Sequence, residues 1–169
     1  MRIRDALHEG AAAGVDRLDA HLLLGHLLRQ PRAWLLAHDE DELSAEVTTD
    51  WRGRLARRAA GEPLAYVLGE WSFRGMTLTV SPAVLVPRPE TEVLVDWALE
   101  CLAAAPSGDV VDLGTGSGAI ALALAQAQPH AQVLATDTDA RALAVAQANA
   151  AKLGLPLRFA QGDWWGAAQ

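Results

Sequence analysis

The most constraining part of the sequence is the stretch Val110-Val-Asp-Leu-Gly-Thr-Gly-Ser-Gly-Ala-Ile-Ala-Leu-Ala123. A β-branched pair opens it, three glycines follow at alternate positions, and good helix formers close it, so the pattern predicts a strand, a glycine-rich turn and a helix. Glycines in such a turn adopt positive φ and let a ligand touch the backbone. The helix points unpaired N–H groups at the turn, which is where open α/β sheets bind nucleotides. We therefore expect a nucleoside-containing cofactor.

Strands and helices alternate from residue 108 onward. The predicted strands are Asp109–Leu113, Gln132–Asp137 and Leu157–Ala160, and the predicted helices are Ala119–Gln128 and Thr138–Lys152, with Thr138 as N-cap and Gly154 at the end. Such alternation is typical of parallel strands with right-handed crossovers and predicts the α/β class. Three parallel strands make a poor finished domain, because parallel sheets are covered on both faces. We therefore expect a truncated form that holds the first βαβαβ half of a Rossmann-like sheet.

The residues before this sheet form two further segments. Residues 1–62 have the apolar spacing of a small helical bundle, which includes a helix that Ser44 caps and that reaches Ala60. Residues 63–88 alternate aromatic and β-branched residues around a glycine and then become rich in proline, which predicts a β-hairpin and an extended linker. Residues 89–169 form the partial cofactor-binding domain, in which Pro89 suits the first position of a helix that reaches about Ala105.

The glycine pattern by itself leaves two cofactor classes open. Gly114, Gly116 and Ala119 satisfy the dinucleotide pattern G-x-G-x-x-A, and Asp137 follows about 20 residues later, so a nicotinamide-dependent oxidoreductase is one alternative. Asp112, however, places a carboxylate two residues before the first glycine, where a pyrophosphate would approach. A cationic ligand suits this position better. S-adenosylmethionine has a ribose with two hydroxyls for Asp137, and it has an ammonium and a sulfonium group for the carboxylate of Asp112.

Class I methyltransferases resemble the sequence at these positions, and Asp163 matches the polar residue that ends their third strand. Longer motifs make the resemblance more specific. They are Asp19-Ala-His-Leu-Leu-Leu, Gly61-Glu-Pro-Leu-Ala-Tyr-Val-Leu-Gly69, Phe73, Val80-Ser-Pro-Ala-Val-Leu-Val-Pro-Arg-Pro-Glu-Thr-Glu92 and Gln161-Gly-Asp-Trp164. Together they look like signatures of the release factor glutamine methyltransferase family, which acts in translation termination, and they span nearly the whole chain.

This resemblance implies a set of cofactor contacts. It assigns Asp137 to the ribose, Trp164 to the adenine and the glycine-rich turn to the methionine and ribose parts. The full set of expected contacts is Asp112, Gly114, Thr115, Gly116, Ser117, Gly118, Asp137, Asp163 and Trp164. Whether Arg88 or Glu92 also contacts ligand stays open.

The resemblance also implies what the chain methylates and what it lacks. The family transfers a methyl group to the side-chain amide of a glutamine in class 1 peptide chain release factors, and its helical domain helps to recognise that protein substrate. Its acceptor-binding Asn-Pro-Pro-Tyr segment is missing, because the sequence contains no Asn-Pro pair. We therefore expect that the chain binds the cofactor but contains no catalytic residues. A non-catalytic fragment or binding module is the alternative.

Composition and charge exclude several other classes. The net charge of -7 argues against direct nucleic-acid binding, which needs clustered cations. Five scattered histidines and one cysteine, Cys101, offer no metal-ligand spacing, and we expect Cys101 to be a buried, inert thiol. No apolar run reaches the roughly 20 residues that a membrane span needs. We expect a cytoplasmic monomer without metal, in which the arginines between Arg52 and Arg58 form a solvated face or, as the alternative, contact the release factor.

Overall fold

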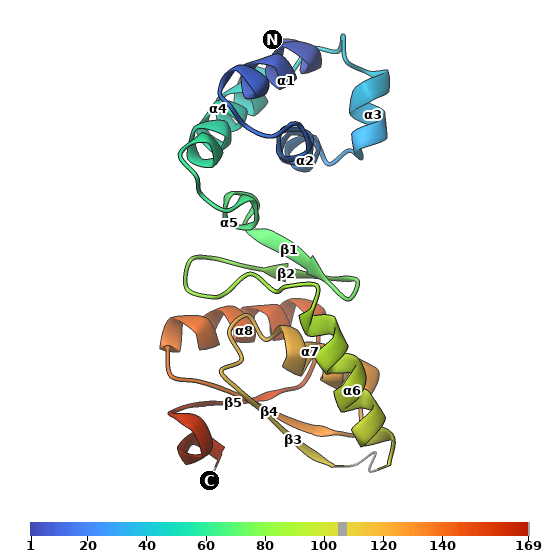
Figure 1. Ribbon diagram of the computed structural model, residues 1–169, viewed down its shortest axis with the longest axis vertical. Coiled ribbons are helices and arrows are strands. Elements are labelled where there is room, and N and C mark those ends of the chain that lie inside the picture. Colours follow the sequence, from blue (N-terminus) through green and yellow to red (C-terminus); the bar gives the residue numbers. More distant parts are fainter. Residues whose placement is uncertain (105–107, 169) are drawn as a thin grey trace. The chain divides into compact units, whose positions relative to one another are not determined.

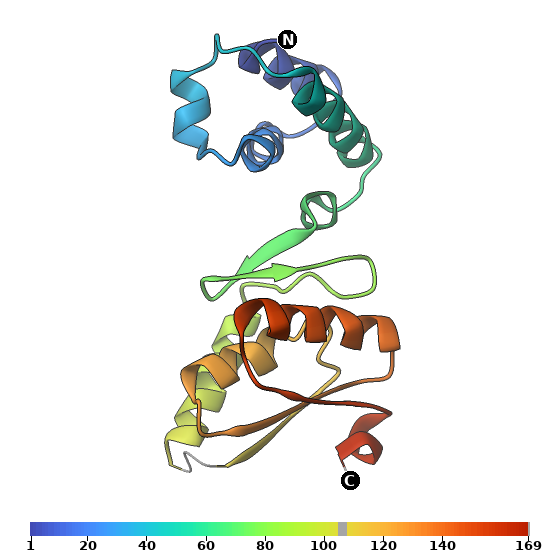
Figure 2. The same cartoon turned by 180° about the vertical axis from the view of Figure 1, so that it is seen from behind.

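A computed structural model describes residues 1–104 and 108–168 of the chain. The chain divides into two compact units, Met1–Leu68 and Gly69–Gln169, and each is described by itself. The first unit is helical, and the second combines helices with two small sheets (Figures 1 and 2). The α/β class is therefore confirmed. The predicted division into residues 1–62, 63–88 and 89–169 stays a proposal about domains.

The first unit consists of five helices around one core. They are α1 (Ile3–Ala12), α2 (Arg17–Leu28), α3 (Arg32–Ala37), α4 (Ala45–Ala59) and α5 (Leu64–Leu68). Trp51 of α4 and Leu23 of α2 are fully buried in that core. Ser44 caps α4 as predicted, because its hydroxyl accepts a hydrogen bond from the Val47 N–H at 3.2 Å. The short helix α5 was not expected from the sequence.

A two-stranded hairpin opens the second unit. Its strands β1 (Glu70–Phe73) and β2 (Met76–Thr79) pair antiparallel, with Phe73 opposite Met76. Arg74 and Gly75 both have positive φ, which is the backbone of a two-residue hairpin loop whose twist matches its strands. The predicted hairpin is confirmed.

The second sheet contains three parallel strands in the order β3, β4, β5. Strands β3 (Asp109–Leu113) and β4 (Gln132–Asp137) have the predicted bounds, and β5 (Arg158–Gln161) begins one residue later than predicted. A short 3₁₀ helix, η1 (Trp164–Ala168), follows β5. Parallel strands in chain order place their carboxyl ends at one edge of the sheet, and that edge is where this fold places ligands.

Three helices lie on the same face of this sheet, as both views of the ribbon show (Figures 1 and 2). They are α6 (Thr91–Ala103), α7 (Ala119–Ala127) and α8 (Ala140–Leu153). Val133 and Ala135 of β4 are buried against α7, and α8 lies between the hairpin and the sheet. This arrangement brings the start of α7, the end of β2 and the middle of α8 together.

Three local predictions were wrong. Thr138 does not cap α8; Asp139 does, through a 2.8 Å bond from the Arg141 N–H to its carboxylate. Pro89 is not the first residue of α6, because a turn with bonds from Thr91 to Arg88 and from Glu92 to Pro89 comes before it. Cys101 is exposed, because it lies on the face of α6 that does not contact the core. A predicted helix end near residue 105 lies outside the described residues.

Candidate cofactor site

The glycine-rich turn between β3 and α7 is held by hydrogen bonds within the protein. Gly114, Gly116 and Gly118 all have positive φ, a backbone conformation that residues other than glycine rarely adopt. The N–H groups of Gly114 and Thr115 both donate to the Thr136 carbonyl oxygen, at 2.9 and 2.8 Å. The Gly118 N–H donates to the Thr115 carbonyl oxygen at 2.9 Å. The turn is therefore preorganised before any ligand arrives.

Asp137, at the end of β4, fixes the middle of the same turn. One carboxylate oxygen accepts a 3.0 Å bond from the Gly116 N–H, and the other accepts a 3.0 Å bond from the Asp139 N–H. Each carboxylate oxygen can accept a further hydrogen bond, because it has two lone pairs. The half-buried side chain can therefore support the turn and still accept bonds from ligand hydroxyls.

Asp112 lies in β3, on the strand that leads into the turn. Its carboxylate accepts a 2.7 Å hydrogen bond from the Thr115 hydroxyl, and its backbone carbonyl oxygen accepts one from the Thr136 hydroxyl at 3.3 Å. Burial raises the pKa of this carboxyl above its ordinary range, and the negative charge of Asp137 acts in the same direction. The Thr115 hydroxyl and the Ala121 N–H oppose the rise. A ligand cation would stabilise the charged form.

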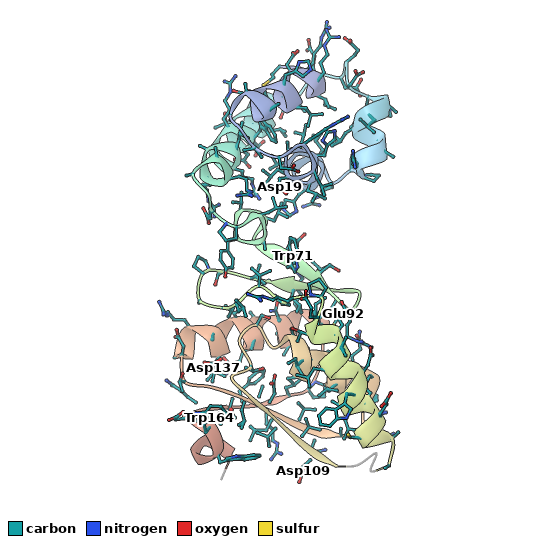
Figure 3. All side chains as sticks on the ribbon, in the orientation of Figure 1. Asp19, Trp71, Glu92, Asp109, Asp137 and Trp164 are labelled. Carbon is teal, nitrogen blue, oxygen red and sulfur yellow. The ribbon has the colours of Figure 1, made fainter. Side chains whose placement is uncertain are left out.

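A pocket of about 290 Å³ opens at the carboxyl ends of the three strands. It is lined by Leu113, Gly114, Asp137, Thr138, Gly162, Asp163 and Trp164. Figure 3 shows Asp137 and Trp164 at the same end of the sheet. The Trp164 side chain is 70% exposed, so its indole is available as a stacking surface. The lining of the pocket thus includes carboxylates and an aromatic ring.

The structure brings part of the predicted site together in this pocket. Gly114, Asp137, Asp163 and Trp164 line it. The side chains of Thr115 and Ser117 are buried instead, at 7% and 3% exposure, and they belong to the support of the turn. Gly116, Gly118 and Asp112 likewise shape the turn without lining the pocket. Contact of each of these residues with a ligand stays a prediction.

Comparison with known proteins identifies the family. Residues 3–69 match the family model described as PrmC N-terminal domain, and residues 91–169 match the model described as methyltransferase small domain. A release factor glutamine methyltransferase from Bordetella pertussis is 50% identical over 157 residues, which are 93% of this chain and 58% of that protein. The chain belongs to the release factor glutamine methyltransferase family. A member from Burkholderia pseudomallei is 44% identical over 92% of this chain and 57% of its own length.

The chain thus spans a little over half the length of the release factor glutamine methyltransferases that it matches. The first family model covers nearly all of the first compact unit, and the second covers most of the second unit, from residue 91 onward. The resemblance that the motifs predicted is therefore confirmed.

Sequence reasoning missed two residues that hold the turn in this family member. Thr136 supplies the carbonyl oxygen that accepts from both Gly114 and Thr115. Asn149 of α8, which is fully buried, bonds to the Ser117 carbonyl oxygen. Thr136 directly precedes the strand-terminal Asp137, so its position was a usable signal. No local pattern marked Asn149, because its partners lie far away in the sequence.

The arginines of α4 contact the protein itself and not only solvent. Arg52 pairs with Glu9 at 2.9 Å, and Arg58 pairs with Asp19 at 2.7 Å. The side chains of the latter pair are only 28% and 19% exposed, so solvent screens this ion pair incompletely. Arg54 and Arg57 also have partners, in the Val67 carbonyl oxygen and the Glu62 carboxylate. The run therefore ties α4 to other helices of its unit.

Glu92, whose role the sequence left open, contacts the hairpin. Its carboxylate accepts a 3.3 Å bond from the Arg74 N–H, and the Arg74 guanidinium pairs with Asp96 one turn later in α6.

Among the described residues, no group of three or more His, Cys, Asp or Glu side chains could hold a metal ion.

Proposed function

We propose that the chain binds S-adenosylmethionine at the carboxyl ends of β3, β4 and β5. We further propose that the whole protein transfers its methyl group to the side-chain amide of a glutamine in class 1 peptide chain release factors. The names of the relatives support this substrate, since they are release factor glutamine methyltransferases. Recognition of the release factor by the helical unit belongs to the same proposal.

The observation that carries the cofactor proposal is that the N–H groups of the glycine-rich turn are already hydrogen-bonded within the protein. A pyrophosphate is bound by several free backbone N–H groups that point at it. Here the N–H groups of Gly114, Thr115, Gly116 and Gly118 already donate to acceptors within the protein. Two carboxylates flank the same turn, at the ends of β3 and β4. This arrangement favours a ligand with positive charge and disfavours a dinucleotide.

The pocket residues suggest how such a ligand is held. We expect both ribose hydroxyls to donate to Asp137, whose oxygens retain unused lone pairs. We expect the adenine to stack on Trp164 and the methionine part to follow the turn toward Asp112. When bound, S-adenosylmethionine supplies an electrophilic methyl group on a sulfonium. The protein's contribution here is to bind and orient it.

Methyl transfer also needs residues that hold the acceptor. An amide nitrogen is a poor nucleophile, because its lone pair is delocalised into the carbonyl group. It must be held in line with the methyl group, with the reacting atoms about 3 to 3.5 Å apart. The resemblance assigns this task to an Asn-Pro-Pro-Tyr segment that the sequence does not contain. For these 169 residues the proposal is therefore cofactor binding without turnover.

Calorimetric titration of the folded chain tests the cofactor. We expect saturable heat with S-adenosylmethionine and none with reduced nicotinamide cofactor under the same conditions. Circular dichroism before the titration shows that the chain is folded. Binding of the nicotinamide cofactor without binding of S-adenosylmethionine would replace this proposal with the oxidoreductase alternative. A methylation assay with a class 1 release factor should show no product with this chain.

The expectations about oligomeric state, cellular location and nucleic-acid binding stay predictions. They are a monomeric state, a cytoplasmic location and no direct contact with nucleic acid. In residues 1–104 and 108–168, no helix has the length and apolar character that a membrane span requires. Size-exclusion chromatography with light scattering measures the oligomeric state directly.

A further inference from the structure

Asn149 is the fully buried polar side chain of α8. It lies on the face that α8 turns toward the hairpin and the glycine-rich turn, together with Ala146 and Ala150. An amide that is buried without hydrogen bonds destabilises the fold, so the partners of this side chain decide whether it stabilises the protein. It is not part of the pocket lining and has no place in the contacts proposed above.

The amide of Asn149 pairs with both backbone groups of one hairpin residue. Its Oδ1 accepts a 2.7 Å bond from the Thr79 N–H, and its Nδ2 donates to the Thr79 carbonyl oxygen at 3.0 Å. The side chain thus acts toward β2 as a neighbouring strand would, because it offers one acceptor and one donor to the same residue. This pairing fixes the end of β2 on α8.

The second N–H of the same amide reaches the glycine-rich turn. Nδ2 donates to the Ser117 carbonyl oxygen at 2.9 Å, so one nitrogen is shared between the hairpin and the turn. The turn also approaches α8 closely at the next residue. A Cβ on Gly118 would lie 3.2 Å from the Ala146 Cβ, in a backbone with φ of +83°. Only a small residue at 146 and a glycine at 118 allow this distance.

We propose that Asn149 is a positioning residue that makes the hairpin and the glycine-rich turn one support for the cofactor. The inference rests on the proposed function, because it concerns how that cofactor site is held. By fixing the Ser117 carbonyl oxygen, Asn149 orients the peptide that precedes Gly118 and the start of α7. By fixing Thr79, it attaches that peptide to β2. A ligand that further restricts the motion of the preorganised turn should therefore also restrict the end of the hairpin.

The variant Asn149→Asp separates this role from simple packing. The replacement has nearly the same shape and still accepts from the Thr79 N–H, but it cannot donate to two carbonyl oxygens when charged. Loss of these two bonds predicts an affinity for S-adenosylmethionine that is about tenfold weaker or more. The matched control is Gln147→Glu, which makes the same amide-to-carboxylate change at an exposed position of α8. The control should bind as the original chain does.

Titration calorimetry at a temperature where circular dichroism shows each variant folded gives the first test. The expected result is weaker binding by the Asn149→Asp chain with unchanged binding by the Gln147→Glu chain. If the Asn149→Asp chain melts at a lower temperature but its folded form binds as tightly as the original, Asn149 is only a packing residue and the proposal is overturned.

Hydrogen exchange of the unchanged chain gives a second test that needs no variant. In the original chain, S-adenosylmethionine should slow exchange of the Gly118 amide and of the Thr79 amide together. Slowing at Gly118 alone would overturn the coupling even if every variant failed to fold.

If the proposed function is wrong, the result is different, because the original chain then does not bind S-adenosylmethionine. The coupling is then tested without ligand in Asn149→Ala, which removes the acceptor of the Thr79 N–H together with the two bonds to carbonyl oxygens, and which should speed exchange at both Thr79 and Gly118 relative to Gln147→Ala at an exposed position. Faster exchange at only one of them, or at neither, would overturn it.

Discussion

The carboxylate of Asp137 accepts hydrogen bonds from two backbone N–H groups, and the same residue lines a pocket. A single side chain therefore links the conformation of the turn to the binding of a ligand. Asp112 differs from it, because its carboxylate is engaged by Thr115 and its pKa is raised by burial. The two acids at neighbouring strand ends should consequently respond differently to substitution.

Asp137→Ala should weaken binding of S-adenosylmethionine by about 2 to 3 kcal/mol, because it removes charge-assisted bonds to both ribose hydroxyls. Calorimetry measures the change as a roughly 30- to 150-fold increase in Kd. Glu100→Ala is the control, since Glu100 is an exposed acid of α6. Equal affinity of the Asp137→Ala chain and the original would remove Asp137 from the ribose site.

Asp112→Asn should raise the melting temperature of the ligand-free chain at pH 7. The pKa of Asp112 is raised in the folded protein, so its contribution to stability is full below the unfolded pKa and is lost as pH rises through the folded one. The charged form present at neutral pH thus destabilises the fold, and asparagine removes that charge while it keeps an acceptor for Thr115. The advantage should disappear toward acidic pH, where the original carboxyl is protonated.

Thermal melts of both chains between pH 3 and pH 8, spanning the ordinary aspartate value of about 4, measure this difference. The same substitution should weaken binding of S-adenosylmethionine, because a cationic ligand favours the charged carboxylate. A less stable Asp112→Asn chain at pH 7 would contradict the argument from burial.

At the scale of elements, side-chain caps define where two of the longer helices begin. Ser44 starts α4, and Asp139 starts α8 with a carboxylate that accepts the Arg141 N–H. A cap satisfies an N–H that the helix itself leaves unpaired. Thr138 was the predicted cap of α8, but its neighbour has the stronger acceptor and takes the position. The first residue of a helix is therefore decided by competition between adjacent residues for the N-cap position.

Ser44→Ala should lower the free energy of unfolding by about 1 kcal/mol, because the Val47 N–H loses its acceptor. Urea unfolding followed by circular dichroism measures it. Ser44→Asp should restore most of the loss, since aspartate is an equally good cap and suits the positive end of the helix. Equal stability of the alanine and aspartate variants would show that the cap contributes little.

At the scale of the whole molecule, the two units have separate hydrophobic cores. The core of the first unit gathers residues from α1 to α5, and the core of the second gathers the hairpin, the helices α6 to α8 and the sheet. Ion pairs of the α4 arginines stay within the first unit. Stability of the helical unit and binding at the sheet should therefore be separable.

Leu23→Ala should destabilise the helical unit by about 2 to 5 kcal/mol, because it opens a cavity at a fully buried position. Binding of S-adenosylmethionine should change by less than about twofold, as expected for sites without shared partners. Denaturant unfolding and calorimetry on the same sample measure both quantities. A large loss of affinity with the chain still folded would show that the units are energetically coupled.

The sequence by itself determined the features that depend on residues close together in the chain. The bounds of β3 and β4 follow from short apolar and β-branched runs between turn residues. The hairpin follows from the glycine at position 75, and the cap at Ser44 follows from a bond across three residues. The motifs likewise determined the family. These signals are local, so a single sequence contains them in full.

Only the tertiary structure decided which distant groups meet. Asn149 reaches Thr79 across 70 residues and Ser117 across 32. The exposure of Cys101 depends in the same way on which helix face is covered. The pocket needed both kinds of information: the sequence placed Asp137 at a strand end, and the folded chain brought Asp137 and Trp164 into one pocket. Contacts of this range depend on packing of whole elements, and no local pattern of residues specifies them.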